Sequence, residues 1–219
     1  MIAEGPCCHP EGVDRSEFLR KHPRLWHVAD ARCWPTIQRH GLFSAARLVE
    51  LFRRGDAGEL LSRRRAEPVV LEHPDHGYAV LRDQGPLNEK KLASALTNGW
   101  SVERWLRQLN DLVFLFPDGA ARDKLIDKYG QSDLLVLTLN TRSLLIEYDI
   151  WLKVASINTG ATVYAAQPRG DDTYRSVDRH EARKPVKEVV VAHAIPDVAD
   201  HLISAELRRP SGERLDLRS

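Results

Sequence analysis

The sequence predicts one α+β domain, and three observations lead to this prediction. Short apolar runs of strand length are interspersed irregularly with segments of helical periodicity, rather than repeating one strand–helix unit. With 219 residues, 42% of them hydrophobic, the chain is long enough to bury one large core. No internal repeat, linker or low-complexity block divides it. We expect a polar N-terminal lead-in (1–22), a single domain (23–207) and a flexible tail (208–219).

Charge and cysteine content exclude few functions. Charged residues make up 29% of the chain and nearly cancel, giving a net charge of +1, so global charge does not predict a nucleic-acid binder. Cys7, Cys8 and Cys33 are an odd set, which favours free thiols in a reducing cytoplasm. The first residues lack the charged-then-apolar pattern of a signal peptide, and no apolar run has the length of a membrane span. The predicted location is therefore the cytoplasm, without a membrane partner.

The first half of the chain predicts short strands and capped helices. Pro35 suits the first turn of a helix that ends at Gly41, and Ser44 and Ser101 are candidate N-caps of later helices. In order, the expected elements are a strand at 25–30, helices near 34–40 and 44–54, two strands around the turn 73–77, and two helices separated at Asn98–Gly99.

The second half predicts three further strands and a long polar loop. We expect strands at 112–116 and Leu134–Leu139, with a helix in 117–130 between them. The loop from Ser156 to Arg179 is rich in Gly, Asn, Thr and Asp, and long irregular segments in compact domains are often functional. A strand beginning at Glu188, a turn, a short helix and a last strand complete the domain.

Familiar catalytic and metal motifs are absent. The chain has no glycine-rich phosphate loop, no nucleophile elbow and no HExxH motif. Cys7, Cys8 and His9 lack the spacing of a zinc knuckle, and His73 and His76 have no evident further ligands. We therefore predict no metal. The remaining candidates are polar residues at strand positions and in the long loop.

Two strand residues are unusual. Glu188 precedes the apolar run Val189–Val191, and His27 lies inside the strand "LWHVAD". A structural interpretation stays open for both: Glu188 as an exposed edge carboxylate paired with Lys187 or Arg183, and His27 as a half-buried imidazole bonded to a backbone carbonyl.

Three blocks of the sequence carry a resemblance to a known superfamily. They are "LWHVADARCWPTIQRHGLFS", "NDLVFLFPDGAARDKLI" and "KPVKEVVVAHAIPDVADHL". Their order resembles the ADP-ribosyltransferase superfamily, in particular its DarT-like branch, with RNA 2′-phosphotransferases as distant relatives. The resemblance implies a split mixed or antiparallel β-sheet core with flanking helices. The chain is also similar to an uncharacterised bacterial domain family with the blocks WPxIxRHGL, INTG and PRGxDT.

The resemblance implies roles for individual residues. Glu188 would be the catalytic glutamate, and His27 would bind a ribose of NAD, which is the substrate. The backbone beside it, at Val28, would receive the nicotinamide amide. At Gly41 and Leu42 the chain would pass close to the dinucleotide. Arg122 would bind the pyrophosphate, or Lys124 would do so if the register differs.

In this superfamily the loop before the glutamate strand selects the acceptor. The polar residues that could bind it here are Asn158, Thr159, Arg169, Asp172 and Thr173, and Tyr164 and Tyr174 could stack on a base. The alternative is that these residues only satisfy one another in a tight loop. Val186 stands where protein-arginine modifiers usually carry Glu or Gln, which favours DNA or RNA over arginine as the acceptor.

Three functions follow from these observations. The first is an NAD-dependent ADP-ribosyltransferase acting on nucleic acid or protein, in the manner of a bacterial toxin or defence effector, with an antitoxin as a further partner. The second is an RNA 2′-phosphotransferase or NAD glycohydrolase on the same fold. The third is a non-enzymatic nucleic-acid- or nucleotide-binding domain, favoured by "SRRRAEP" and several arginines.

Overall fold

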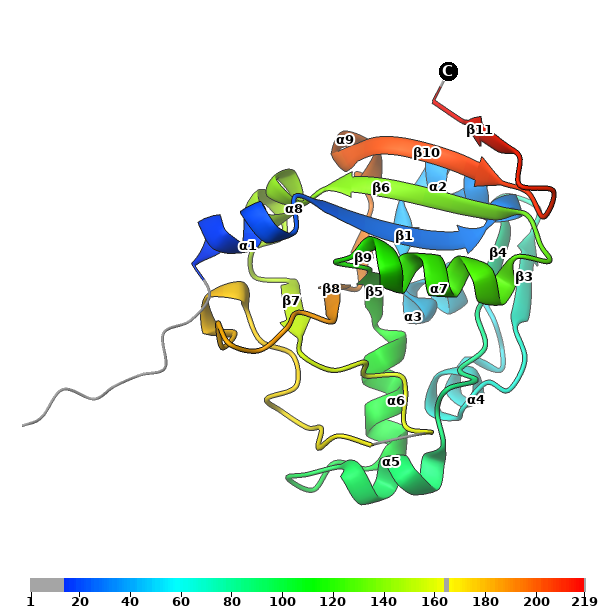
Figure 1. Ribbon diagram of the computed structural model, residues 1–219. Coiled ribbons are helices and arrows are strands. Elements are labelled where there is room, and N and C mark those ends of the chain that lie inside the picture. The colour runs from blue at the N-terminus through cyan, green and yellow to red at the C-terminus, as the bar shows by residue number, and fades with distance from the viewer. Residues whose placement is uncertain (1–13, 164–165, 219) are drawn as a thin grey trace, which may run out of the picture.

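A computed structural model of the chain describes residues 14–163 and 166–218. Two antiparallel sheets lie at its centre, and helices surround them (Figure 1). The predicted α+β class is therefore confirmed.

The larger sheet has the strand order β1-β6-β10-β11, and all of its pairings are antiparallel. Its strands are β1 (Arg24–Asp30), β6 (Leu134–Asn140), β10 (Leu202–Arg208) and β11 (Arg214–Asp216). In β6, the residues from Leu134 to Leu137 are all buried, as expected of a central strand that is covered on both faces.

The second sheet has the order β5-β8-β7 and is also antiparallel. It contains β5 (Leu112–Leu115), β7 (Leu152–Ala155) and, between them, β8 (Glu188–Ala192). One antiparallel bridge, Trp26 to Phe116, joins the edge of β1 to the end of β5. Among the described residues, this bridge is the one backbone pairing between the two sheets.

Two small antiparallel pairs complete the strands. They are β2 (Leu42–Phe43) with β9 (Ala194–Ile195), and β3 (Val69–His73) with β4 (Gly77–Leu81). The second pair is the hairpin predicted around the turn 73–77.

Helices cover the sheets from several sides (Figure 1). In chain order they are α1 (Arg15–Lys21), α2 (Trp34–His40), α3 (Ala45–Leu51), α4 (Ala57–Ser62), α5 (Glu89–Ala95), α6 (Val102–Asn110), α7 (Gly119–Tyr129), α8 (Thr141–Glu147) and α9 (Val198–His201), with short 3₁₀ turns η1 (Ala31–Cys33) and η2 (Val177–Arg179). The predicted N-caps are confirmed, because Ser44 Oγ accepts from Arg47 N–H and Ser101 Oγ from Arg104 N–H.

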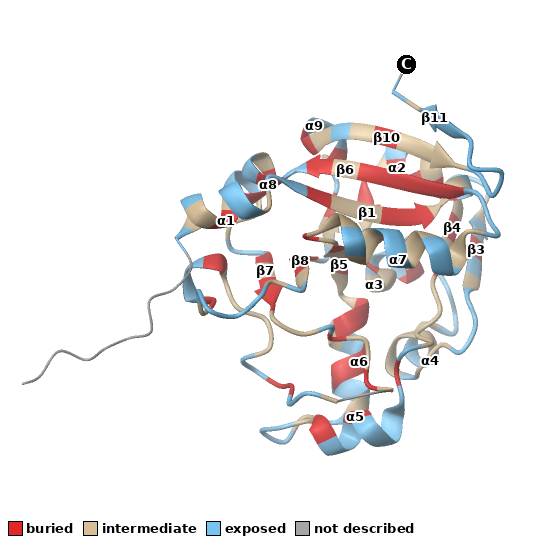
Figure 2. Ribbon diagram, viewed as in Figure 1, coloured by how far each residue is buried: buried red, intermediate tan, exposed pale blue. Residues whose placement is uncertain are grey.

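The main core lies between the two sheets. Leu25, Leu137, Val189 and Val191 are fully buried within one cluster that also holds Ile37 of α2. Side chains alternate along β1, so Trp26 and Val28 point to the opposite face, where α7 packs. A third cluster under α5 and α6 contains Trp105. Buried residues accordingly concentrate in β1, β6, β7 and α6 (Figure 2).

The structure differs from the sequence prediction at both ends. The predicted polar lead-in contains α1, whose Phe18 is buried against the main core. The predicted flexible tail forms β11, which pairs with β10 as a hairpin. Neither strand β7 nor helix α8 was predicted: β7 has only four residues beside the polar loop, and α8 begins directly after β6 ends at Asn140.

Candidate active site at the start of strand β8

Glu188 is the first residue of the central strand of the three-stranded sheet. It pairs with Ala155 of β7, and the next residues, Val189–Val191, are fully buried. Its side chain is only partly exposed. A carboxylate in this position must be hydrogen-bonded, because an unpaired buried charge is very costly.

Thr159, from the long polar loop, supplies those hydrogen bonds. Its backbone N–H donates to Glu188 Oε1 at 3.1 Å, and its hydroxyl donates to Oε2 at 2.6 Å. Tyr174 in turn donates its hydroxyl hydrogen to Thr159 Oγ1 at 2.7 Å. A carboxylate offers about four lone-pair positions, so each oxygen of Glu188 can still accept another hydrogen bond.

Burial sets the protonation of this network. It raises the pKa of Glu188 to about 7, against the opposing effects of the two Thr159 hydrogen bonds and of the positive charge on Arg169. The pKa of Tyr174 also rises, again chiefly through burial. Tyr174 therefore stays a donor at neutral pH, while Glu188 divides between its acid and base forms, as a general acid or base requires.

Arg169 is the charged neighbour of this network and is only 2% exposed. Its Nη2 donates to the carbonyl oxygens of Asn158 (3.3 Å) and Ala161 (3.1 Å). Within the described residues, its Nε and Nη1 have no hydrogen-bond partner. Burial lowers the pKa of Arg169 from its ordinary value, and the negative charge of Glu188 opposes that change.

The two polar blocks of the loop hold one another in place. Arg169 joins the block Ile157–Gly160 to the block Pro168–Thr173 through the Asn158 carbonyl. Thr97 N–H donates to the Arg169 carbonyl oxygen at 2.9 Å. A Cβ on Gly170 would lie 2.5 Å from Thr97 Oγ1, so any other residue there would displace the Thr97 side chain. Many polar groups of this loop therefore form hydrogen bonds within the protein, as expected if the loop residues only satisfy one another.

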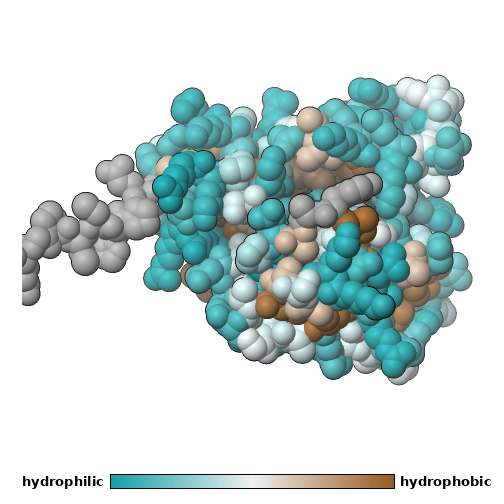
Figure 3. Space-filling model, turned by 60° about the horizontal axis from the view of Figure 1, so that its bottom comes forward, coloured by the Kyte–Doolittle hydropathy of each residue, from teal (hydrophilic) through white to brown (hydrophobic). Residues whose placement is uncertain are grey.

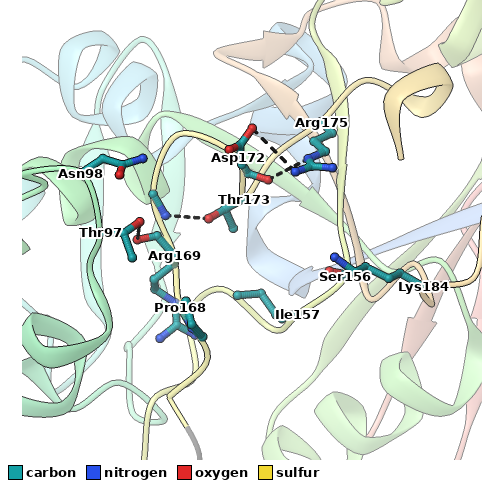
Figure 4. A pocket seen from close by; sticks show the side chains of 11 residues that line it. Thr97, Asn98, Ser156, Ile157, Pro168, Arg169, Asp172, Thr173, Arg175 and Lys184 are labelled. Atoms are coloured by element: carbon teal, nitrogen blue, oxygen red, sulfur yellow. Dashed lines mark hydrogen bonds and ion pairs between the residues drawn. The ribbon is translucent and has the colours of Figure 1, made fainter. Parts of the chain in front are cut away.

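A pocket of about 230 Å³ lies beside this network (Figure 4). Three predicted substrate-binding residues, Arg169, Asp172 and Thr173, line it. The other lining residues are Thr97, Asn98, Ser156, Ile157, Pro168, Gly170, Arg175 and Lys184. Seen from the side of α5, the molecular surface is mixed, with hydrophobic patches among hydrophilic side chains (Figure 3).

The predicted loop residues thus divide into two groups. Asn158 and Asp172 are exposed, and Thr173 is partly exposed, with its Oγ1 accepting from Gly170 N–H at 2.8 Å. Thr159 is fully buried and, like Arg169, contacts protein groups. Tyr174, which we expected to stack on a base, stacks instead on Trp105 with ring centroids 6.2 Å apart. Tyr164 lies outside the described residues.

His27 is half-buried on the core-facing side of β1. Its Nδ1 lies 3.0 Å from the Phe114 carbonyl oxygen. A carbonyl only accepts, so Nδ1 carries the hydrogen and Nε2 is left as an acceptor. Burial lowers the pKa of His27 to about 4, so the ring is neutral at physiological pH.

The fold brings His27 near the strand that carries Glu188. Phe114, which holds His27, pairs with Val190 of β8. No hydrogen bond joins His27 to Glu188 among the described residues. Trp26 exchanges both backbone hydrogen bonds with Phe116, so its backbone faces away from β6. By strand alternation the N–H and C=O of Val28 also face away from β6, and Val28 is 4% exposed.

Gly41, Leu42 and Arg122 lie apart from Glu188. Gly41 has a φ of +86°, and a Cβ there would lie 2.3 Å from the Ile195 carbonyl oxygen. The close approach predicted for a dinucleotide is therefore made with the chain's own backbone. Leu42 belongs to the main core. Arg122 lies over the Trp26 ring at 4.9 Å, on the α7 side of the sheet, and pairs with Asp123.

No sequence motif points to several residues of the site. Thr97 and Asn98 lie between two predicted helices, and Lys184 precedes β8. Only the fold brings these segments together.

The described residues contain no group of three or more His, Cys, Asp or Glu arranged to hold a metal ion. Cys7, Cys8 and His9, whose spacing does not favour a metal site, lie outside the described residues. No helix in the described part of the chain is long and apolar enough to cross a membrane.

Comparison with known proteins identifies a family. A model described as a family of unknown function, DUF7002, matches residues 23–202. The chain belongs to this family. The match runs from the residue before β1 to the first residue of β10, so Glu188, Thr159, Arg169 and His27 all lie inside the part that defines the DUF7002 family. No curated protein matches the chain.

Proposed function

We propose that this DUF7002 protein is an NAD-dependent ADP-ribosyltransferase with Glu188 as its catalytic glutamate and a split-sheet fold of the ADP-ribosyltransferase type. The observation that carries the proposal is the Glu188 carboxylate at the start of a buried central strand, held by Thr159 and near Arg169, which lines a polar pocket. The single bridge between the two sheets is consistent with a split-sheet fold.

The proposed chemistry uses the negative charge of Glu188. Breaking the bond between ribose and nicotinamide leaves a sugar with oxocarbenium character, and a fixed carboxylate beside it stabilises that positive charge. The lone pairs that Thr159 leaves free can accept from a ribose hydroxyl. A pKa of about 7 also allows Glu188 to take a proton from the acceptor.

His27 and Val28 are proposed to bind NAD. The neutral ring of His27 has Nε2 as an acceptor, which suits a ribose hydroxyl. The N–H and C=O of Val28, which face away from β6, suit the carboxamide of nicotinamide, which is both donor and acceptor. The surroundings of Arg122, Gly41 and Leu42 support no binding role, and the proposal leaves them out.

DNA or RNA is the proposed acceptor. Three cations line the pocket: Arg175 and Lys184, which share Glu181, and Arg169, whose Nε and Nη1 have no hydrogen-bond partner within the described residues. Two carboxylates, Glu181 and Asp172, stand against these three cations, and the positive charge that remains suits a phosphate-bearing substrate. A transferase of this kind would act as a toxin or defence effector, and an antitoxin would then be a further partner.

The test uses NAD labelled in its adenylate part. The protein is incubated with labelled NAD and DNA, RNA or cell lysate, and labelled macromolecules are separated from free ADP-ribose. We expect label on nucleic acid with the wild type and at least a hundredfold less with Glu188→Gln. Glu72→Gln, which changes an exposed carboxylate on β3, is the matched control.

Each other outcome has a clear meaning. Label on protein alone would change the acceptor class. Free ADP-ribose alone would indicate an NAD glycohydrolase. Full transfer by Glu188→Gln, or no turnover under any condition, would overturn the proposal.

A binding domain without catalysis is the second candidate. It is favoured by the occupation of both Glu188 oxygens by Thr159 and by the cations at the pocket. Salt-dependent binding of nucleic acid by both the wild type and Glu188→Gln, without NAD turnover, would support it.

A further inference from the structure

A second pocket lies at the other end of β8. Its volume is about 470 Å³, and segments far apart in the sequence form it. Arg47 comes from α3, Tyr148 and Trp151 from the chain after α8, and Ala192–Ala194 from the β8–β9 connection. It shares no lining residue with the first pocket, so this second pocket is separate from the proposed catalytic site.

His193 is held in place at this pocket. Its φ of +65° is uncommon for a residue other than glycine. Its backbone N–H donates to the Asp111 carbonyl oxygen at 2.8 Å, and its Nδ1 lies 2.9 Å from Asp111 Oδ1. The carboxylate only accepts, so Nδ1 carries the hydrogen and Nε2 is available to a ligand.

Trp151 offers the pocket an aromatic surface. It is 46% exposed, which is unusual for so large an apolar side chain. Its ring meets the His193 ring edge-on, with centroids 5.5 Å apart and planes at 65°. An edge-on neighbour fixes the indole without covering both of its faces, and Ala192 and Ala194 add little bulk beside it.

Arg47 supplies hydrogen-bond donors. Its Nη1 pairs with Glu50, and within the described residues no other hydrogen bond of its guanidinium is found. A guanidinium has five N–H donors in a rigid fork, so most of them remain for a ligand. Such a fork matches the paired acceptors O6 and N7 on the edge of guanine.

The charge around the pocket favours an uncharged ring over a phosphate. Each polar lining group is already matched by a carboxylate: Arg47 by Glu50, His193 by Asp111 and Tyr148 by Asp197. No surplus positive charge is left to attract an anion.

We propose that this second pocket binds a nucleobase, guanine by preference, which stacks on Trp151 while Arg47 reads its O6/N7 edge. The base belongs either to a free nucleotide or to a single strand of nucleic acid, whose phosphate stays outside the pocket.

Titration calorimetry of the full chain tests the proposal. GMP, AMP, CMP and UMP are the free ligands, and a short oligothymidylate with one central guanine represents the strand. We expect GMP to bind tightest, and Trp151→Ala and Arg47→Gln each to weaken it about tenfold. Ile146→Ala, an exposed apolar residue of α8, and Arg63→Gln, a surface arginine paired with a helical glutamate, are the matched controls.

The outcomes separate the sources and the alternatives. Tighter binding of the oligonucleotide than of GMP assigns the site to a strand, and the reverse assigns it to a free nucleotide. Equal affinity for all four nucleotides, no saturable binding at millimolar concentration, or binding unchanged in Arg47→Gln would overturn the proposal. Since NAD is absent throughout, failure here leaves the proposed transferase activity untouched.

Discussion

His27 and Glu188 are both half-buried ionisable groups in strands, yet the protein surrounds them differently. One backbone carbonyl holds His27, and the ring is neutral because burial lowers its pKa to about 4. Glu188 has two donors from Thr159 and a buried cation nearby, and its pKa is about 7. Burial disfavours the charged form of both residues. The Phe114 carbonyl partly restores it at His27, and Thr159 and Arg169 do so at Glu188.

Because Glu188 is an acid and His27 a base, burial gives the two residues opposite effects on the pH dependence of stability. Between pH 4.5 and 7, folded Glu188 binds more protons than unfolded Glu188, so its contribution to stability falls as pH rises. Between pH 4 and 6.5, the unfolded state binds more protons at His27, so its contribution rises with pH. These effects oppose each other in the wild type, and single substitutions should separate them.

The largest predicted effect comes from removing the cation near Glu188. In Arg169→Met, the carbonyl oxygens of Asn158 and Ala161 lose their donor inside the protein. We expect the free energy of unfolding in urea to fall by about 3 kcal/mol at pH 7. Arg183→Met, whose side chain is 85% exposed, should change it by less than about 0.5 kcal/mol. A loss below about 1 kcal/mol for Arg169→Met would mean that Arg169 does not organise the loop.

Glu188→Gln should isolate the pH dependence of Glu188. From pH 5 to pH 8, the wild type should lose about 2 kcal/mol of stability relative to the variant, because the wild-type carboxyl group must ionise where it is poorly solvated. Urea unfolding at both pH values measures this difference. Parallel stability curves for the two proteins would contradict a raised pKa at Glu188.

The contribution of His27 to stability should change with pH in the opposite direction. In His27→Gln the side-chain amide can still donate to the Phe114 carbonyl but cannot be protonated. From pH 6.5 down to pH 4, the wild type should lose about 2 kcal/mol relative to this variant. Measurement by NMR of the His27 ring protonation would check the cause directly, and a pKa near 6.5 would contradict the prediction.

The smallest predicted loss of stability comes from removing the Tyr174 hydroxyl, which donates to Thr159 Oγ1. Tyr174→Phe removes the hydrogen bond to Thr159 Oγ1 and should cost about 1 kcal/mol. Tyr78→Phe is the matched control, because within the described residues the Tyr78 hydroxyl is buried without a partner. Its removal should cost nothing or stabilise the fold. Equal losses in both variants would mean that the Tyr174 hydrogen bond is unimportant.

Local pattern predicted most of the secondary structure. The strand at 25–30, the hairpin around 73–77 and the helix caps at Ser44 and Ser101 depend on neighbours within a few residues, so the sequence shows them. Strand β7, helix α8 and the terminal strand β11 were missed. β7 and β11 are short, and they are stabilised by pairing with strands distant in the sequence.

The sequence by itself determined that Glu188 opens an apolar strand and that a polar loop precedes it. Only the tertiary structure decided what surrounds the carboxylate. Thr159 is 29 residues from Glu188, and Tyr174 and Arg169 reach the same site from different parts of the loop. Hydrogen bonds between distant side chains follow no local spacing, so the fold alone turns an unusual strand residue into a carboxylate with a pKa of about 7.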